Sequence, residues 1–207
     1  MITRVTIGRP AYRPADPRAE PAMMGLVSLL GTHGISWSGA WVFDDPDIAH
    51  AHNDLLAQFL AGDGERLLII DTDILFRPRD ALRLLLSDHD YVGANYRKKV
   101  RGDGMASMAR AGGAVLGELV EAQVLATGFL SLSRHAVERL SSVSPAMLDG
   151  GMLARAPMAA GSGADGRWQG SDEALCRRWR ALGEVAWIDT SVHLGHVGTH
   201  VYTEEDK

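Results

Sequence analysis

Two aspartates separated by one residue follow an apolar run in the first half of the chain. The stretch RLLIIDTDILFRP covers Arg66 to Pro78 and carries Asp71 and Asp73 directly after Leu67–Ile70. Two carboxylates this close repel each other unless a positive charge lies between them. A divalent metal ion that also holds a diphosphate is the simplest such charge, because Mg²⁺ and Mn²⁺ bind oxygen ligands. A solvated acidic turn is the alternative.

The strand before these aspartates is predicted to be buried on both faces. Alternate residues of a strand share a face, so Leu67, Ile69, Asp71 and Asp73 are expected to line up. Strands that are apolar on both faces are typical of parallel sheets covered by helices. Ligands of such sheets bind beyond the carboxyl ends of the strands. The two aspartates are therefore expected at the ligand-binding edge.

Strands and helices are predicted to alternate along the chain, which indicates one α/β domain over residues 1–207. Strands are expected at 2–8, 35–43, 67–70, 91–96 and 128–133, and a last strand with its exit at 184–200. Helices are expected at 22–34, 45–62, 77–90, 134–142 and 171–183. Residues 101–127 are predicted to be an irregular, partly β excursion. Residues 143–170 hold six glycines and are predicted to be a flexible loop that closes over the substrate.

The second predicted helix carries a histidine on its apolar face. Asp45 is suited to cap this helix, and Pro46 to its first position. His52 shares the face of Leu55 and Phe59, so it points toward the core or a ligand. Most histidines in such positions are simply packed and hydrogen-bonded.

Composition is that of an ordinary globular domain. The chain has 207 residues, 46% hydrophobic and 23% charged, and its net charge of −5 exerts no global pull on nucleic acid. The segment YRKKVR, residues 96–101, carries four cationic side chains. It is either a solvated loop or a segment that binds the phosphate of a nucleotide or polynucleotide. One cysteine excludes an internal disulfide. No signal peptide or spanning segment is evident, so a cytoplasmic location is expected, in a bacterium or a phage-infected host.

Several segments, taken in order, resemble motifs of glycosyltransferases with a GT-A fold, of the family-2-like kind with an aspartate–x–aspartate motif. These segments are IAHAHNDLLAQFL, LLIIDTDILFRPRDALRLLL, YVGANYRKK, ATGFLSLSRHAVERL, GSDEALCRRWRALG and LGHVGTH. The resemblance implies a Rossmann-related α/β fold with a mostly parallel, mixed sheet and helices on both faces. It also implies a nucleotide-sugar donor, such as a UDP- or GDP-sugar, and a divalent metal ion, Mn²⁺ or Mg²⁺.

The metal ligands follow from this resemblance by position. Asp73 would hold the metal ion, and Asp71 would contact the metal ion or the donor ribose. His196 would be a further ligand, and an imidazole ligand favours manganese over magnesium. Lys98 and Lys99 would steady the departing diphosphate, where negative charge builds up.

The catalytic residues are also implied by the resemblance. Asp172 would be the general base that removes a proton from the acceptor hydroxyl. Glu173 would take that role if the register slips by one residue, since Ser171 stands where the family has a glutamate. Stabilisation of the helix dipole, with Ser171 as cap, is the alternative interpretation. Gly128 matches a glycine that allows close approach to the backbone.

The nucleoside is expected to lie near Tyr12, Asp44 and Asn53. Tyr12 would stack on the base, and Asp44 follows the second predicted strand. His52 stands where the family has an arginine, so the phosphate contact of that arginine is not carried over.

Three readings of the function follow. The first is transfer of a sugar to a hydroxyl, with a glycan or a hydroxymethylated DNA base as candidate acceptor and with inversion if Asp172 is a base. The second is a haloacid-dehalogenase-type phosphatase, because IIDTDILF also resembles its nucleophile strand, with Asp71 attacking phosphate. The third is a non-catalytic module that binds a nucleotide-sugar or a nucleic acid. The oligomeric state does not follow from the sequence.

Overall fold

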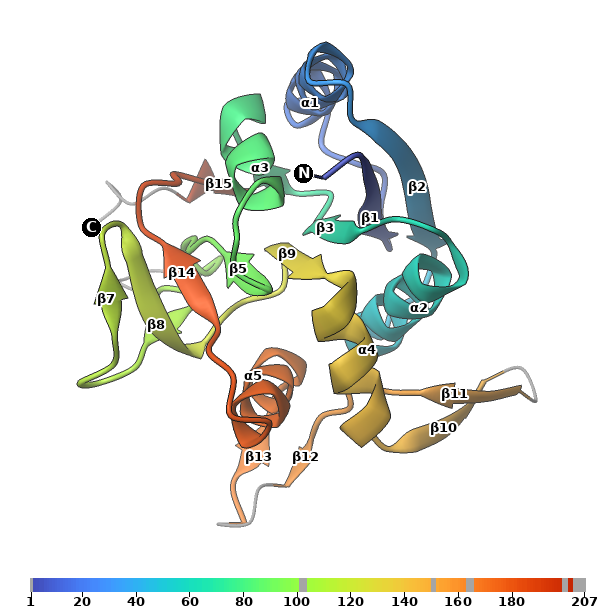
Figure 1. Cartoon of the computed structure of the whole chain (residues 1–207), viewed down its shortest axis with the longest axis vertical. Coiled ribbons are helices and arrows are strands. Elements are labelled where there is room, and N and C mark those ends of the chain that lie inside the picture. Colours follow the sequence, from blue (N-terminus) through green and yellow to red (C-terminus); the bar gives the residue numbers. More distant parts are fainter. Residues whose placement is uncertain (1, 101–103, 150–151, 163–165, 199–200, 203–207) are drawn as a thin grey trace.

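A nine-stranded mixed sheet forms the centre of the molecule (Figure 1). The computed structural model describes residues 2–100, 104–149, 152–162, 166–198 and 201–202. The strands of this sheet lie in the order β2-β1-β3-β9-β5-β14-β8-β6, and β7 also pairs with β8. Their bounds are β1 Arg4–Ala11, β2 Ser36–Phe43, β3 Arg66–Ile70, β5 Tyr91–Gly93, β6 Met108–Ala109, β7 Val115–Leu116, β8 Leu119–Val124, β9 Phe129–Ser133 and β14 Trp187–Asp189.

Most strands of the main part of the sheet run in one direction. β1 is parallel to β2 and β3, and β14 is parallel to β5. β9 runs against both of its neighbours, β3 and β5. The antiparallel strands β6, β7 and β8 extend the sheet beyond β14. The excursion predicted for residues 101–127 therefore belongs, over its described part, to this extension.

Helices cover both faces of the sheet and divide the core into two clusters. α1 (Glu20–Thr32) and α3 (Pro78–Leu85) pack on one face, against side chains that include Leu68 and Ile70. α2 (Ile48–Ala61), α4 (Arg134–Val143) and α5 (Ser171–Ala181) pack on the other, against side chains that include Leu67 and Ile69. The alternation of β3 between the two clusters is the one expected of a strand buried on both faces. The predicted fold class is confirmed.

Two helix caps differ from the sequence-based expectation. The cap of α2 is Asp47, whose side chain accepts hydrogen bonds from the backbone of Ala49 and His50. Asp45 contacts the His50 ring instead, at 2.5 Å. At α5 the cap position is Gly170, and Ser171 is the first helical residue. At α2 the neighbouring aspartates can compete for the free N–H groups of the helix start, and Asp47 binds them. At α5 the cap residue is a glycine, which makes no side-chain hydrogen bond.

The prediction of a flexible loop over residues 143–170 is wrong for most of its described part. Two short hairpins lie there, β10 (Ala146–Asp149) with β11 (Met152–Arg155), and β12 (Gly161–Ser162) with β13 (Trp168–Gln169). Between them Met158 is fully buried and its backbone N–H binds the side chain of Asn53. Arg178 donates to the carbonyls of Pro157 and Ala159. The middle of the segment is therefore anchored to α2 and α5.

The last predicted strand and its exit contribute to two sheets. β14 is the strand, and the exit runs through a turn into β15 (Gly195–Val197). β15 pairs with β4 (Ile74–Leu75) and β16 (Val201–Tyr202) in a separate small sheet. Among the described residues, no helix is long and apolar enough to cross a bilayer.

Candidate functional site

Asp71 and Asp73 lie in a turn, and their side chains meet different partners. β3 ends at Ile70, and the N–H of Ile74 donates to the carbonyl of Asp71 at 3.2 Å. The period-two pattern of the strand stops there, so it does not place the two carboxylates, although both line one cavity. Asp71 keeps the side of Ile69, toward α2, whereas Asp73 turns toward β15.

Asp71 faces a buried histidine. The Nδ1 atom of His52 is 2.8 Å from the carbonyl oxygen of Ile48, so this nitrogen carries a proton and donates. The Nε2 atom then points at Oδ1 of Asp71, 3.7 Å away. Both atoms are buried and have no hydrogen-bond partner among the described residues. His52 is therefore more than a packed core histidine, because it forms one wall around the Asp71 carboxylate.

Asp73 lies between a lysine and a second histidine. Lys99 forms an ion pair with Oδ2 of Asp73. The Nε2 atom of His196 is 3.6 Å from Oδ1 of Asp73. The small sheet sets this distance, because His196 is the strand partner of Ile74 and the N–H of Val197 donates to the carbonyl of Asp73. Burial raises the pKa of Asp73, but the hydrogen bonds of His196 and Lys99 outweigh it, so the pKa lies below its ordinary value. Asp73 is held as a carboxylate at neutral pH.

Gly128 fills a space that no side chain could enter. A Cβ atom on Gly128 would lie 2.5 Å from the hydroxyl oxygen of Tyr96 and 2.7 Å from Oδ2 of Asp71. The N–H of Gly128 donates to the Tyr96 hydroxyl at 3.1 Å, and its carbonyl accepts from the N–H of Asp71 at 2.9 Å. Burial and the charge of Asp71 raise the pKa of Tyr96 well above its ordinary value. Because position 128 has no side chain, Asp71 and Tyr96 can both lie against its backbone.

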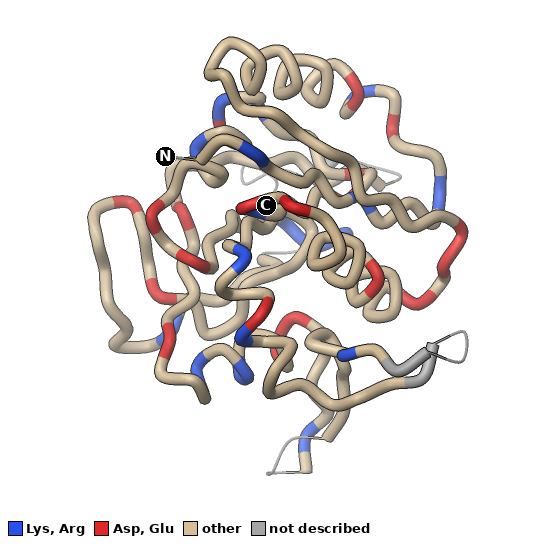
Figure 2. The backbone as a smooth tube through the Cα atoms, turned by 45° about the vertical axis from the view of Figure 1, so that its right-hand side comes forward, with Lys and Arg blue, Asp and Glu red and all other residues tan. Residues whose placement is uncertain are grey.

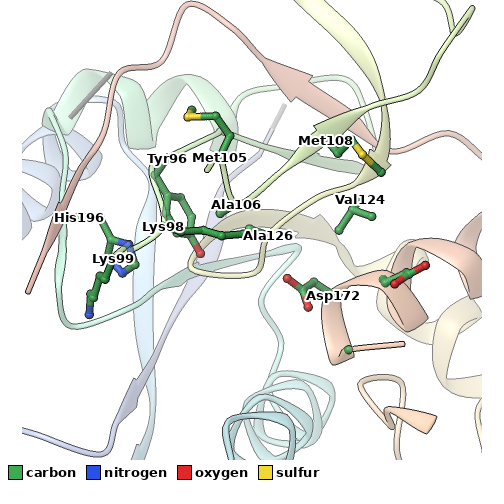
Figure 3. Close-up of a pocket in the computed structure, with 12 residues that line it drawn as sticks. Tyr96, Lys98, Lys99, Met105, Ala106, Met108, Val124, Ala126, Asp172 and His196 are labelled. Carbon is green, nitrogen blue, oxygen red and sulfur yellow. The ribbon is translucent and has the colours of Figure 1, made fainter. Parts of the chain in front are cut away.

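Two cavities meet at the Lys99–Asp73–His196 contact. The Asp71 cavity has a volume of about 270 Å³. It is lined by Pro10, Tyr12, Arg13, Ile48, Asp71, Thr72, Asp73 and Lys99. The Asp172 cavity has a volume of about 540 Å³ and shares Lys99 with the first (Figure 3). It is lined by Tyr96, Lys98, Lys99, Met105, Ala106, Met108, Val124, Ala126, Gly170, Asp172, Glu173 and His196.

Asp172 and Glu173 lie in the first turn of α5, at the Asp172 cavity. Both are half-buried. In Figure 3 the carboxylate of Asp172 points into the cavity, across from the side where His196 and Lys99 lie. The positive end of the helix macrodipole lies beneath them and favours negative charge there. A substrate in the cavity could therefore have the Asp172 carboxylate on one side and Lys99 and His196 on the other.

The cationic segment of residues 96–101 is partly solvated in its described part. Arg97 is only 5% exposed, whereas Lys98 and Lys99 are exposed residues that line the Asp172 cavity, and Lys99 pairs with Asp73. Arg101 lies outside the described residues. Basic and acidic residues are interspersed along the backbone in Figure 2. Two of these cations are thus placed to meet a bound anion at the cavities.

The remaining predicted residues do not all reach the site. Tyr12 is 54% exposed and lines the Asp71 cavity. Asp44 adopts a left-handed backbone conformation with φ of 58° and lines neither cavity. Asn53 is buried, and its side-chain oxygen accepts from the N–H of Met158 at 2.9 Å. Asn53 therefore serves the packing of α2 in this structure.

Sequence reasoning missed two residues that line the cavities. Arg13 lies beside Tyr12 at the Asp71 cavity, and its guanidinium is 5.9 Å from the centre of the Tyr12 ring. Tyr96 contacts His196 edge to face, with ring centres 4.9 Å apart. Two features of the sequence could have indicated these residues. Tyr96 directly precedes three cationic residues, and Arg13 lies in a loop at the end of a strand, where binding residues are common.

The residues around Asp73 fit a divalent metal ion that is also held by phosphate oxygens. Nδ1 of His196 is 2.7 Å from the carbonyl oxygen of Arg97, to which it donates, so Nε2 is the ring nitrogen that faces Asp73 and would bind the ion. Metal-binding histidines are oriented by this kind of contact. No three His, Cys, Asp or Glu side chains of the described residues lie close enough to hold a metal ion by themselves. Ligands from a diphosphate would complete such a site.

Comparisons with known proteins support the fold. No family model matches the chain, and no curated protein sequence matches it. Among solved structures, A197 from STIV has a TM-score of 0.59 at 14% identity, covering 99% of this chain and 92% of that one. A Drosophila β-1,4-galactosyltransferase 7 mutant in complex with manganese, UDP-Gal and xylobiose has a TM-score of 0.53 at 14% identity, covering 100% and 69%. A UDP-glucose pyrophosphorylase complexed with UDP-glucose has a TM-score of 0.51 at 13% identity, covering 91% and 90%. At this identity the likeness shows the fold, which is that of GT-A-like glycosyltransferases and nucleotidyltransferases.

Proposed function

We propose that this protein is a metal-dependent glycosyltransferase that moves a sugar from a nucleotide-sugar to an acceptor hydroxyl. The observation that carries the proposal is the junction of two cavities at Asp73, Lys99 and His196. A donor needs one space for its nucleoside, one for its sugar with the acceptor, and a cationic centre between them for the diphosphate. The two cavities on either side of Lys99 are consistent with this need for two spaces and a cationic centre between them.

The donor would lie across the junction. Tyr12 and Arg13 would contact the nucleoside in the Asp71 cavity, and Asp71 would bind the ribose or the metal ion. Asp73 and His196 would hold Mn²⁺ or Mg²⁺ together with diphosphate oxygens. When bound, that ion neutralises the charge that develops on the leaving diphosphate. Lys99 would leave Asp73 for the diphosphate, and Lys98 would add a second cation.

Asp172 would be the base for the acceptor. Its carboxylate lines the cavity where the sugar and the acceptor would meet. Asp172 would accept the proton of the acceptor hydroxyl, and that oxygen would attack the anomeric carbon from the face opposite the diphosphate. Inversion is the expected outcome. Glu173, which lines the same cavity, is the second candidate for the base.

The phosphatase alternative finds less support in the geometry. Oδ1 of Asp71 is buried against His52, so a nucleophilic Asp71 would have to attack phosphate through Oδ2 alone. A trapped aspartyl-phosphate on Asp71 would nevertheless overturn the glycosyltransferase proposal. Binding of a nucleotide-sugar without turnover, with manganese and many acceptors, would favour the non-catalytic module.

A donor screen tests the proposal directly. Purified protein with Mn²⁺ is incubated with UDP- and GDP-sugars, and released nucleotide is measured. Asp73→Asn is expected to abolish metal-dependent release, and Asp172→Asn to lower turnover while donor binding persists. Asp63→Asn, on an exposed residue outside both cavities, is the matched control. Normal metal-dependent release by Asp73→Asn would show that the metal assignment is wrong.

A nucleic-acid acceptor can be tested by salt. Contacts with phosphates release counterions, so binding to DNA should weaken steeply between 50 and 200 mM salt, roughly 10³-fold or more for six contacts. Salt-insensitive binding would count against DNA as the acceptor.

A further inference from the structure

The Asp172 cavity has polar ends and an apolar wall. Lys99 and His196 lie at one end, and Asp172 lies at the other (Figure 3). Glu173, the neighbour of Asp172 on α5, also lines the cavity. Five apolar residues complete much of the lining between them, with Tyr96 and Lys98 beside them: Met105, Ala106, Met108, Val124 and Ala126. A site for a bare polyol would be expected to carry more hydrogen-bonding side chains, because each buried hydroxyl needs a partner.

Backbone pairing holds this wall in place. Met108 is the partner of Val124 across β6 and β8, and Met105 forms an isolated bridge with Arg97. The N–H of Ala106 donates to the carbonyl of Tyr96 at 2.8 Å. Because these backbone groups are used within the protein, the wall meets a ligand mainly with its apolar side chains.

Met108 leaves apolar surface in contact with water. Its side chain belongs to the cavity lining, yet the residue is 55% exposed. A ligand that covers this surface gains from the hydrophobic effect. The thioethers of Met105 and Met108 are also polarizable and contact aromatic rings favourably. A flat ring therefore fits this wall better than a sugar.

We propose that the acceptor is an aromatic or heteroaromatic ring that carries a hydroxyl or hydroxymethyl group. This inference rests on the proposed glycosyl transfer. The ring packs on Met105, Met108 and Val124, and its hydroxyl reaches toward Asp172. The O–H bond breaks as Asp172 takes the proton, the oxygen bonds to the anomeric carbon, and the bond to the diphosphate breaks. The nucleoside diphosphate leaves with the electron pair.

Matched acceptors test the proposal by turnover. The donor with the highest nucleotide release is offered with benzyl alcohol, 5-hydroxymethyl-2′-deoxycytidine or methyl β-glucoside, which all carry a primary hydroxyl. The two ring alcohols are expected to give the higher kcat/KM. Comparing them separates a simple aromatic alcohol from a nucleobase. An equal or higher kcat/KM for methyl β-glucoside would overturn the inference.

A pair of variants tests the wall. Met108→Ser should raise the KM for benzyl alcohol at least fivefold. Leu116→Ser should change it less than twofold, because Leu116 is 53% exposed on the neighbouring strand β7 but does not line the cavity. An unchanged KM in Met108→Ser would contradict the proposed wall.

A binding measurement separates this inference from the transferase proposal. In protein with ¹³C-labelled methionine methyl groups, benzyl alcohol should shift the signals of Met105 and Met108 but not that of Met24, which lies on α1 away from the cavity. These shifts without sugar transfer from any donor would support the aromatic site and contradict the transferase. Sugar transfer without these shifts would do the reverse.

Discussion

His52 on α2 and Asp71 after β3 face each other at 3.7 Å, with both facing atoms buried. The contact of Nδ1 with the Ile48 carbonyl fixes which ring nitrogen points at the carboxylate. Since Asp71 also approaches Gly128 and Tyr96, its carboxylate is constrained on both oxygens. We infer that His52 positions Asp71, which lines the cavity that is proposed to bind the nucleoside.

His52→Ala should therefore lower kcat for nucleotide release by roughly 10- to 100-fold, because a carboxylate displaced by about 1 Å loses its productive geometry. His52→Gln keeps an amide N–H in reach of Asp71 and should recover part of the loss. His50→Ala, on the same helix but facing Asp45, is the control. A loss of stability in His52→Ala with normal kcat would show that His52 only packs the core.

Lys99 would compete with the proposed metal ion for Asp73. In this structure the Lys99 ammonium pairs with the carboxylate that is proposed to bind the ion. Lys99→Met should therefore bind Mn²⁺ more tightly without donor, by a factor of roughly two to ten, because the competing cation is absent. Turnover should fall, since the leaving diphosphate loses a cation. Titration of free Mn²⁺ by electron paramagnetic resonance checks the first expectation, and weaker Mn²⁺ binding would contradict the competition.

Gly128→Ala should damage both folding and activity. The new Cβ would lie within 3 Å of Tyr96 and Asp71, and overpacking of this kind costs about 1–3 kcal/mol. Tyr96→Phe in the same chain removes the closer contact and should recover part of the stability but not the activity. Gly31→Ala, at a helical position with open space around it, should leave activity unchanged and raise stability by about 0.5–1 kcal/mol. Denaturant unfolding and nucleotide release measure both effects.

Glu65 should make stability depend on pH below its ordinary pKa. The side chain accepts hydrogen bonds from Thr3 Oγ1 and from the backbone N–H groups of Thr3 and Arg4, and the Thr3 hydroxyl is the first cause that lowers its pKa from 4.5. The stabilisation is therefore present above pH 4.5 and is lost as the pH falls through the lowered pKa of the folded state. Glu65→Gln should reduce stability at pH 7 and flatten the loss of stability below pH 4.5, in urea unfolding at several pH values.

Glu138→Gln is a suitable control for that experiment. Glu138 is exposed on α4 and lies 3.8 Å from Arg134. Its replacement should change the unfolding free energy at pH 7 by less than about 0.5 kcal/mol. An equal effect of both substitutions would contradict the role of Glu65.

The sequence by itself determined the architecture and predicted the edge of the sheet where the candidate site lies. Hydrophobic patterns separated strands from helices, and the two-sided burial of Leu67–Ile70 indicated a sheet covered on both faces. The same pattern put Asp71 and Asp73 at the edge where ligands bind. These features are local, so a short stretch of residues is enough to specify them.

Only the tertiary structure decided the partners of each group. Strand periodicity could not place Asp73, because β3 ends at Ile70 and the turn sends Asp73 toward His196 on β15. The contact of Asp71 with His52 depends on how α2 packs on the sheet. The hydrogen bond from the N–H of Met158 to the Asn53 side chain depends on the position of the same helix. Each of these contacts joins residues far apart in the chain, and their geometry follows from the packing of whole elements rather than from local patterns.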